Sequence, residues 1–145
     1  MLQIREFVRP ETLEQAYGLL SANKAATLVG GGAYLRLGNK RIGTAIDMTA
    51  LGLSTLETDG QSCLIGAGVT FGELERSPLL AEKYCGVFAQ ALRDVVGVQF
   101  RNTVTVGATV FSRYGFSDLL PPLLALNASV QLHHQGSCPW PTSCS

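Results

Sequence analysis

The chain has 145 residues, 46% of them hydrophobic and 15% charged, and its 11 basic side chains balance its 11 acidic ones. This length and composition suit one packed domain rather than a disordered segment. The net charge of zero argues against non-specific binding to nucleic acid, which needs excess basic side chains, and against electrostatic attachment to a membrane.

Hydrophobic periodicity and turn residues predict short helices and short strands along most of the chain. Thr12 precedes an apolar helical face and stands three residues before Gln15, which is the spacing of a capping box. The pair Asp59-Gly60 between two apolar runs indicates a β-hairpin. In chain order, the expected elements are a helix from residue 13, strands at 26–29 and 44–47, a hairpin of 53–58 with 63–67, helices at 71–76 and from 78 to about 95 with Gly86 as a weak point, a helix at 118–126 and a strand at 129–133.

Two further segments have a distinctive composition. Residues 97–111 are rich in Gly, Val and Thr, and we expect loop and short strand there. From residue 136 onward, GSCPWPTSCS shows no periodicity and holds half of the cysteines. Strands and helices alternate in the rest of the chain, so the predicted class is mixed α and β.

No apolar run is long enough to span a bilayer, and the N-terminal MLQIREFVRP lacks the layout of a secretory signal. We therefore expect a cytoplasmic protein. The cysteines, Cys63, Cys85, Cys138 and Cys144, form no Cys-x-x-Cys pair. The sequence thus predicts neither a zinc site nor an iron–sulfur cluster, and the thiols are interpreted as reduced packing residues.

The first candidate binding segment is LVGGGAYLRLG, residues 28–38. A strand that ends in three glycines can turn sharply and expose successive backbone N–H groups to a phosphate. The segment is not a P-loop, because no Gly-Lys-Ser/Thr follows. It is not a dinucleotide fingerprint either, because Leu35 stands where the last glycine would be. On these residues alone, a plain turn is an equally good interpretation.

In the second candidate segment, Thr105, Gly107 and Thr109 could form another phosphate nest with a hydroxyl on either side. Asp118 follows at an expected helix start, where a helix cap is a better interpretation than a ligand. Arg101 could contact an anion, although an ordinary surface arginine is the simpler interpretation. Two phosphate-favouring loops indicate a ligand with two linked phosphates.

The remaining candidates are weaker. His133 and His134 stand near the end of a predicted strand and are interpreted as solvated residues rather than ligands. The sequence has no Ser-His-Asp pattern, no cluster of paired carboxylates and no His-Glu-x-x-His motif. We therefore predict no catalytic residue and no metal ligand, and a cofactor must supply any chemistry in which the chain takes part.

Collinear segments of the chain resemble the FAD-binding subunits of molybdenum hydroxylases, a family that includes xanthine dehydrogenase, carbon monoxide dehydrogenase and the nicotinate and purine hydroxylases. The resemblance covers about residues 9–135. The matching segments are PETLEQA (10–16), VGGGAYL (29–35), AIDMTAL (45–51), LIGAGVTFGEL (64–74), QFRNTVTVGA (99–108) and residues 117–132.

The resemblance implies an α+β fold of the PCMH type, in which two small α/β subdomains hold FAD between them. Asp118 would also approach the cofactor. The residues implied to contact the FAD pyrophosphate are Val29, Gly30, Gly31, Gly32, Ala33, Tyr34 and Leu35, with Thr105, Gly107, Ala108 and Thr109 as a second wall.

The resemblance also implies an electron-transfer role. A partner subunit with two [2Fe–2S] clusters would deliver electrons to FAD, a partner with the molybdenum cofactor would hydroxylate the substrate, and NAD+ or another acceptor would be reduced. Two alternatives stay open. One is a stand-alone flavin reductase of the same broad fold, of the cell-wall enolpyruvyl reductase type; the other is a truncated remnant that binds no FAD.

The chain departs from the family pattern at three places. Ala33 and Tyr34 replace a Thr-Asp pair, so the first loop would bind through its backbone. Ala108 replaces a glycine, which costs little if its φ is negative. The family's FAD domain also continues for some tens of residues and is followed by a further domain, so residues 1–135 are expected to be an incomplete FAD-binding domain.

The segment at residues 136–145 is expected to be an atypical tail. A one-base shift in possible codons for CPWPTSC yields Met-Pro-Leu-Ala-Asp-Phe-Leu, a continuation that resembles the family. We therefore predict that Cys138 to Cys144 are a frameshifted reading, which the nucleotide sequence of the gene would test.

Overall fold

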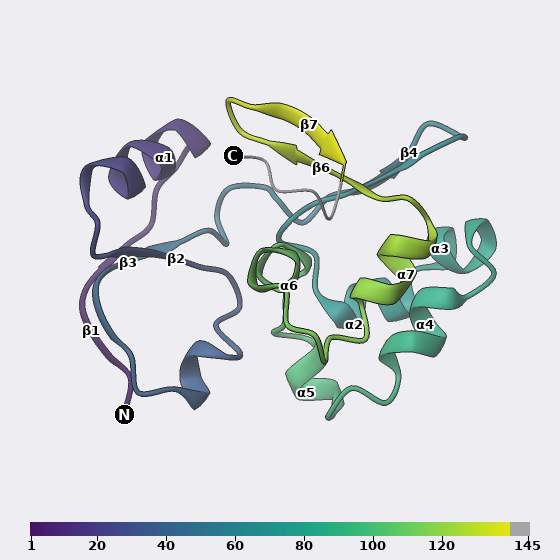
Figure 1. Cartoon of the computed structure of the whole chain (residues 1–145), viewed down its shortest axis with the longest axis horizontal. Coiled ribbons are helices and arrows are strands. Elements are labelled where there is room, and N and C mark those ends of the chain that lie inside the picture. Colours follow the sequence, from purple (N-terminus) through teal and green to yellow (C-terminus); the bar gives the residue numbers. More distant parts are fainter. Residues whose placement is uncertain (140–145) are drawn as a thin grey trace.

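The first subdomain is a three-stranded parallel sheet with one helix. It is seen in a computed structural model that describes residues 1–139. The strands lie in the order β1-β3-β2, and α1 packs against β2 and β3 (Figure 1). Its elements are β1 (Gln3–Val8), α1 (Leu13–Ala22), β2 (Ala26–Val29) and β3 (Arg41–Asp47). The central strand β3 is mostly buried, whereas the edge strand β1 is mostly exposed. Because β1 is mostly exposed, its residues carry no clear apolar pattern, and no strand was expected there.

The second subdomain packs short helices around one apolar core beside two small hairpins (Figure 1). Its largest fully buried side chains include Phe88, Leu74, Leu80 and Leu92. A short 3-10 helix, η1 (Leu35–Leu37), precedes β3 in the first subdomain. The elements of the second subdomain are β4 (Leu56–Thr58), β5 (Cys63–Ile65), α2 (Phe71–Arg76), α3 (Pro78–Lys83), α4 (Val87–Leu92), α5 (Val98–Arg101), α6 (Val106–Ser112), α7 (Leu120–Ala125), β6 (Ser129–Leu132) and β7 (Gly136–Pro139).

The helix start predicted at Thr12 is confirmed. The Thr12 hydroxyl accepts a hydrogen bond from the Gln15 N–H, although the Gln15 side chain accepts from Glu11 rather than from Thr12. At α2 the capping box is complete, because Thr70 accepts from the Glu73 N–H and Glu73 accepts from the Thr70 N–H. These bonds join residues three or four positions apart, so they depend on the local sequence.

Two predicted stretches are wrong. The expected single helix from residue 78 to about 95 is divided into α3 and α4, because Cys85 and Gly86 take positive φ values of 51° and 71°. Residues 97–111, expected as loop and short strand, form α5 and α6. Their Val- and Thr-rich composition is a weak helix former, and the packing of Phe100 of α5 and Val106 of α6 in the core overrides it.

Arg101 is not the surface residue that the sequence indicated. Its side chain is 9% exposed and holds the Glu75 carboxylate through Nε at 2.9 Å and Nη2 at 3.3 Å. Nη1 donates to the Val95 carbonyl oxygen at 3.2 Å. Arg101 thus holds α5 against α2, and its guanidinium is paired with Glu75 instead of being available to bind an anion.

The end of the described chain forms a hairpin, with β7 antiparallel to β6. Residues 140–145 lie outside the described residues, so the frameshift proposed for Cys138 to Cys144 stays a prediction. Within residues 1–139, none of the helices is both long and apolar enough to cross a membrane.

We predict that Arg101→Met lowers the free energy of unfolding by about 2 kcal/mol, because it leaves the Glu75 charge without its partner. The loss stays below that of a fully buried pair, since the Glu75 side chain is 21% exposed. Arg93→Met is the control, because its pair with Asp94 is largely exposed and should contribute at most about 0.5 kcal/mol. Similar losses in urea denaturation of the two variants would contradict this assignment.

Candidate functional site

The glycine loop, residues 30–34, follows β2 at the carboxyl end of the parallel sheet. Within residues 1–139, the five backbone N–H groups of Gly30, Gly31, Gly32, Ala33 and Tyr34 donate to no protein acceptor. Gly32 takes a left-handed φ of 72°, which changes the direction of successive N–H groups along the loop. A run of free N–H groups around a left-handed residue is typical of an anion-binding nest.

The loop also makes a close backbone contact between the two subdomains. A Cβ atom on Gly31 would overlap the backbone carbonyl of Thr103, and one on Gly30 would lie 2.8 Å from the Thr105 hydroxyl oxygen. The absence of side chains therefore lets the two backbones approach each other. Gly30 and Gly31 are therefore needed for the contact between the two subdomains, independently of any ligand that the loop binds.

Two hollows meet at Gly31 and Thr49, which line both. Their volumes are about 330 Å³ and about 400 Å³, each in the range of small-molecule sites. We call the two together the junction groove. The first hollow is lined by Leu2, Ile4, Phe7, Arg9, Val29, Gly30, Gly31, Gly32, Leu35, Arg36, Asp47 and Thr49, and the second by Gly31, Thr49, Ser54, Gly68, Thr70, Glu73, Arg76, Asn102, Thr103 and Thr105.

The sequence analysis missed two arginines at this groove. Arg36 lies close to the glycine loop, with its Nε 3.9 Å from the position of a Cβ on Gly32, and it makes no ion pair within residues 1–139. Arg76 lines the second hollow and donates to the Asn102 side-chain oxygen at 3.2 Å. A basic residue directly after a glycine loop is the signal that would have identified Arg36.

A third arginine at the groove is already paired. Arg9 holds the buried Asp47 carboxylate at 2.9 Å, and the Thr49 N–H and hydroxyl donate to the same carboxylate. Burial would raise the pKa of Asp47, but these donors from Thr49 and Arg9 outweigh it and hold the pKa below its ordinary value. Asp47 is therefore an ionised anchor of the turn after β3.

Tyr34 reaches from the glycine loop into the second subdomain. Its ring lies edge-on to Phe100 at 5.5 Å and packs against Tyr114 and Phe116 at 5.4 and 6.2 Å. Burial raises the pKa of the Tyr34 hydroxyl, and the charges of Tyr114 and Asp118 raise it further. Tyr34, which stands where the family pattern has an aspartate, thus holds the loop against the second subdomain by aromatic packing.

Asp118 does not cap a helix, so that interpretation is wrong. The N-cap of α7 is Leu119, and Asp118 is exposed on the preceding turn. Its charge acts on the Tyr34 hydroxyl, which places it near the end of the glycine loop.

Of the four residues predicted to form the second wall, Thr105, Gly107, Ala108 and Thr109, only Thr105 lines the groove. Thr105 faces Gly30 and lines the groove. The Gly107 N–H donates to the Ala67 carbonyl at 2.8 Å, and the buried Thr109 hydroxyl donates to the Thr105 carbonyl at 3.0 Å. Ala108 lies in α6 without a positive φ, so its replacement of glycine costs little, as expected. Gly107, Ala108 and Thr109 line neither hollow, and of the first loop's predicted residues Ala33 and Tyr34 also lie outside them.

Residues 2–139 match a family model described as the FAD binding domain in molybdopterin dehydrogenase. A xanthine dehydrogenase FAD-binding subunit from Escherichia coli is 28% identical over 140 residues, covering 92% of this chain and 47% of that protein. The nicotine 6-hydroxylase medium subunit from Paenarthrobacter nicotinovorans is 29% identical over 133 residues, covering 87% of this chain and 46% of that protein. The chain therefore spans about half the length of these relatives.

Solved structures show the same fold. A chain of a Cu,Mo-CO dehydrogenase matches with a TM-score of 0.84 at 22% identity, covering 96% of this chain and 51% of that chain. A chain of reconstituted CO dehydrogenase from Oligotropha carboxidovorans has a TM-score of 0.83 at 21% identity, covering 92% of this chain and 49% of that chain. The α+β fold inferred from the resemblance is thereby confirmed.

We predict that Gly31→Ala lowers the free energy of unfolding by at least about 2 kcal/mol, because the added methyl group overlaps the Thr103 carbonyl and overpacks the junction. Gly18→Ala is the matched control. Gly18 lies inside α1 with open space around it, so alanine should stabilise the chain by about 0.5–1 kcal/mol. Urea denaturation measures both, and a Gly31→Ala variant as stable as the parent chain is incompatible with the close contact.

Proposed function

The chain belongs to the family of FAD binding domains in molybdopterin dehydrogenases, and on that premise we propose that its glycine loop holds the FAD pyrophosphate. One observation carries the proposal: five consecutive N–H groups, from Gly30 to Tyr34, have no acceptor within residues 1–139. Buried or half-buried N–H groups normally find a partner. A pyrophosphate supplies several acceptor oxygens and the negative charge that such a nest favours.

The side chains around the loop fit the same ligand. Arg36 brings to the nest a positive charge that has no ion-pair partner among residues 1–139, and the Thr105 hydroxyl lies across the groove from Gly30. The two hollows on either side of Gly31 suit a molecule of two bulky parts joined by a diphosphate. When bound, FAD supplies the redox chemistry, while this chain binds and orients it.

We further propose that the whole protein is the electron-transfer subunit of a molybdenum hydroxylase. It would connect a partner that carries [2Fe–2S] clusters with NAD+ or another acceptor, and a second partner with the molybdenum cofactor would hydroxylate the substrate. The support is the family itself, together with relatives whose names describe them as an FAD-binding subunit and a medium subunit.

Arg36→Gln should weaken binding of FAD to the chain about tenfold, the effect of losing roughly 1.4 kcal/mol in one charge-assisted contact. Lys24→Gln removes an equal charge from an exposed turn that lines neither hollow and should leave the affinity unchanged. Quenching of flavin fluorescence during titration gives both affinities. Equal weakening by both variants would reveal a general charge effect and remove Arg36 from the site.

For the partners, affinity purification of the tagged chain from its source cell should recover an iron–sulfur subunit and a molybdenum-cofactor subunit. The chain would then carry flavin within a larger complex. Recovery of a monomer that is active alone as a flavin reductase would contradict the proposal and favour the stand-alone alternative.

A further inference from the structure

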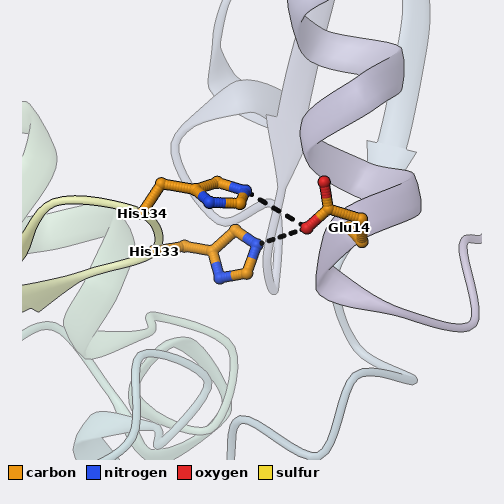
Figure 2. Close-up of side chains that lie close together, drawn as sticks. All are labelled: Glu14, His133 and His134. Carbon is orange, nitrogen blue, oxygen red and sulfur yellow. Dashed lines mark hydrogen bonds and ion pairs between the residues drawn. The ribbon is translucent and has the colours of Figure 1, made fainter.

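A cluster of two histidines and one glutamate lies apart from the junction groove, where α1 meets the turn between β6 and β7 (Figure 2). The Nε2 atom of His133 lies 3.2 Å from Oε2 of Glu14, and the Nε2 atom of His134 lies 3.1 Å from the same oxygen. These are the only two histidines of the chain. From the sequence, both were interpreted as solvated residues. They are exposed, but both side chains point toward the same carboxylate, that of Glu14.

The turn after β6 brings the two rings to one side. Consecutive residues of an extended strand point in opposite directions, so neighbouring histidines would normally diverge. His134 instead takes a left-handed φ of 69°, and both rings then face α1. Tyr17, on the same helix as Glu14, packs its ring against His134 at 4.7 Å and His133 at 6.1 Å. Both histidine rings thus pack against the same helix that carries Glu14.

The spacing of the three atoms suits a small cation. Zinc lies about 2.0–2.2 Å from nitrogen and oxygen ligands, which places neighbouring ligands of a tetrahedron about 3.3–3.5 Å apart. The nitrogen–oxygen distances of 3.2 and 3.1 Å are close to this, and all three atoms lie within 4.8 Å of one another. Both rings approach the same carboxylate oxygen, Oε2 of Glu14. If the rings made only hydrogen bonds to this carboxylate, each could use a different oxygen.

We propose that Glu14, His133 and His134 bind a divalent transition-metal ion of the zinc class, with solvent completing the coordination. Imidazole and carboxylate together are ligands that suit zinc, and the exposure of all three residues leaves space for water. The bound ion connects α1 of the first subdomain with the β6–β7 hairpin of the second (Figure 1). It therefore stabilises the folded chain by mass action, without entering the junction groove.

Calorimetric titration of the chain with Zn²⁺ alone tests the site. We expect one ion per chain, a melting temperature that rises with Zn²⁺ concentration, and affinity at least about tenfold lower in His134→Ala and Glu14→Gln. Glu82→Gln, which removes an exposed carboxylate elsewhere, should bind as the parent chain does. No binding, or binding that survives both ligand variants, overturns the proposal and leaves a cluster held by hydrogen bonds alone.

The cysteines are the competing ligands, and Co²⁺ distinguishes them. A Co²⁺ complex at the proposed site should show visible ligand-field bands without the intense near-ultraviolet charge-transfer band that thiolate ligands produce. A variant with all four cysteines replaced by serine should retain the ion. A thiolate band in the parent chain, or loss of the ion from the folded serine variant, would assign the metal to the thiols and refute this site.

Discussion

The contact between the backbone of Gly31 and the carbonyl of Thr103 determines how the two halves of this protein meet. No side chain fits between them, so the glycine loop lies directly against the second subdomain. Ala33 and Tyr34 then pack on the core of that subdomain, and the N–H groups of the loop are left without protein acceptors within residues 1–139. The groove and the free N–H groups beside it are therefore consequences of one close approach of two backbones.

The two loops that resemble the family differ in how many free backbone N–H groups they offer to a ligand. The first offers free N–H groups, whereas in the second the N–H groups of Val106 and Gly107 donate to the carbonyls of Val69 and Ala67. The Arg101–Glu75 pair holds α5 against α2, and these bonds together present Thr105 to the groove. Most of the second motif thus maintains the wall of the site, and Asn102, Thr103 and Thr105 are its residues that line the groove.

Local interactions account for what the sequence could predict. The Thr12 cap of α1 and the apolar run of β2 before its glycines are visible in a few consecutive residues. Tertiary contacts account for the failures. Phe100 of α5 and Val106 of α6 pack in the core, which overrides the weak helix propensity of the segment. Arg101 is buried against Glu75, a partner 26 positions earlier that the local sequence does not reveal. The glycine loop was found, but Arg36, two residues after it, was overlooked, and Arg76 is brought to the groove only by the fold. The histidine cluster likewise joins residues 119 positions apart.

The central claim is that the free N–H groups of the glycine loop bind the two linked phosphates of the cofactor. Backbone amide NMR of the ¹⁵N-labelled chain, titrated with inorganic pyrophosphate and then with FAD, tests it most directly. The account predicts that both ligands shift the amide signals of Gly30, Gly31, Gly32, Ala33 and Tyr34 more than those of Val106 and Gly107, whose N–H groups already donate to carbonyls. Shifts confined to other residues, or unchanged loop signals at saturating FAD, would contradict it.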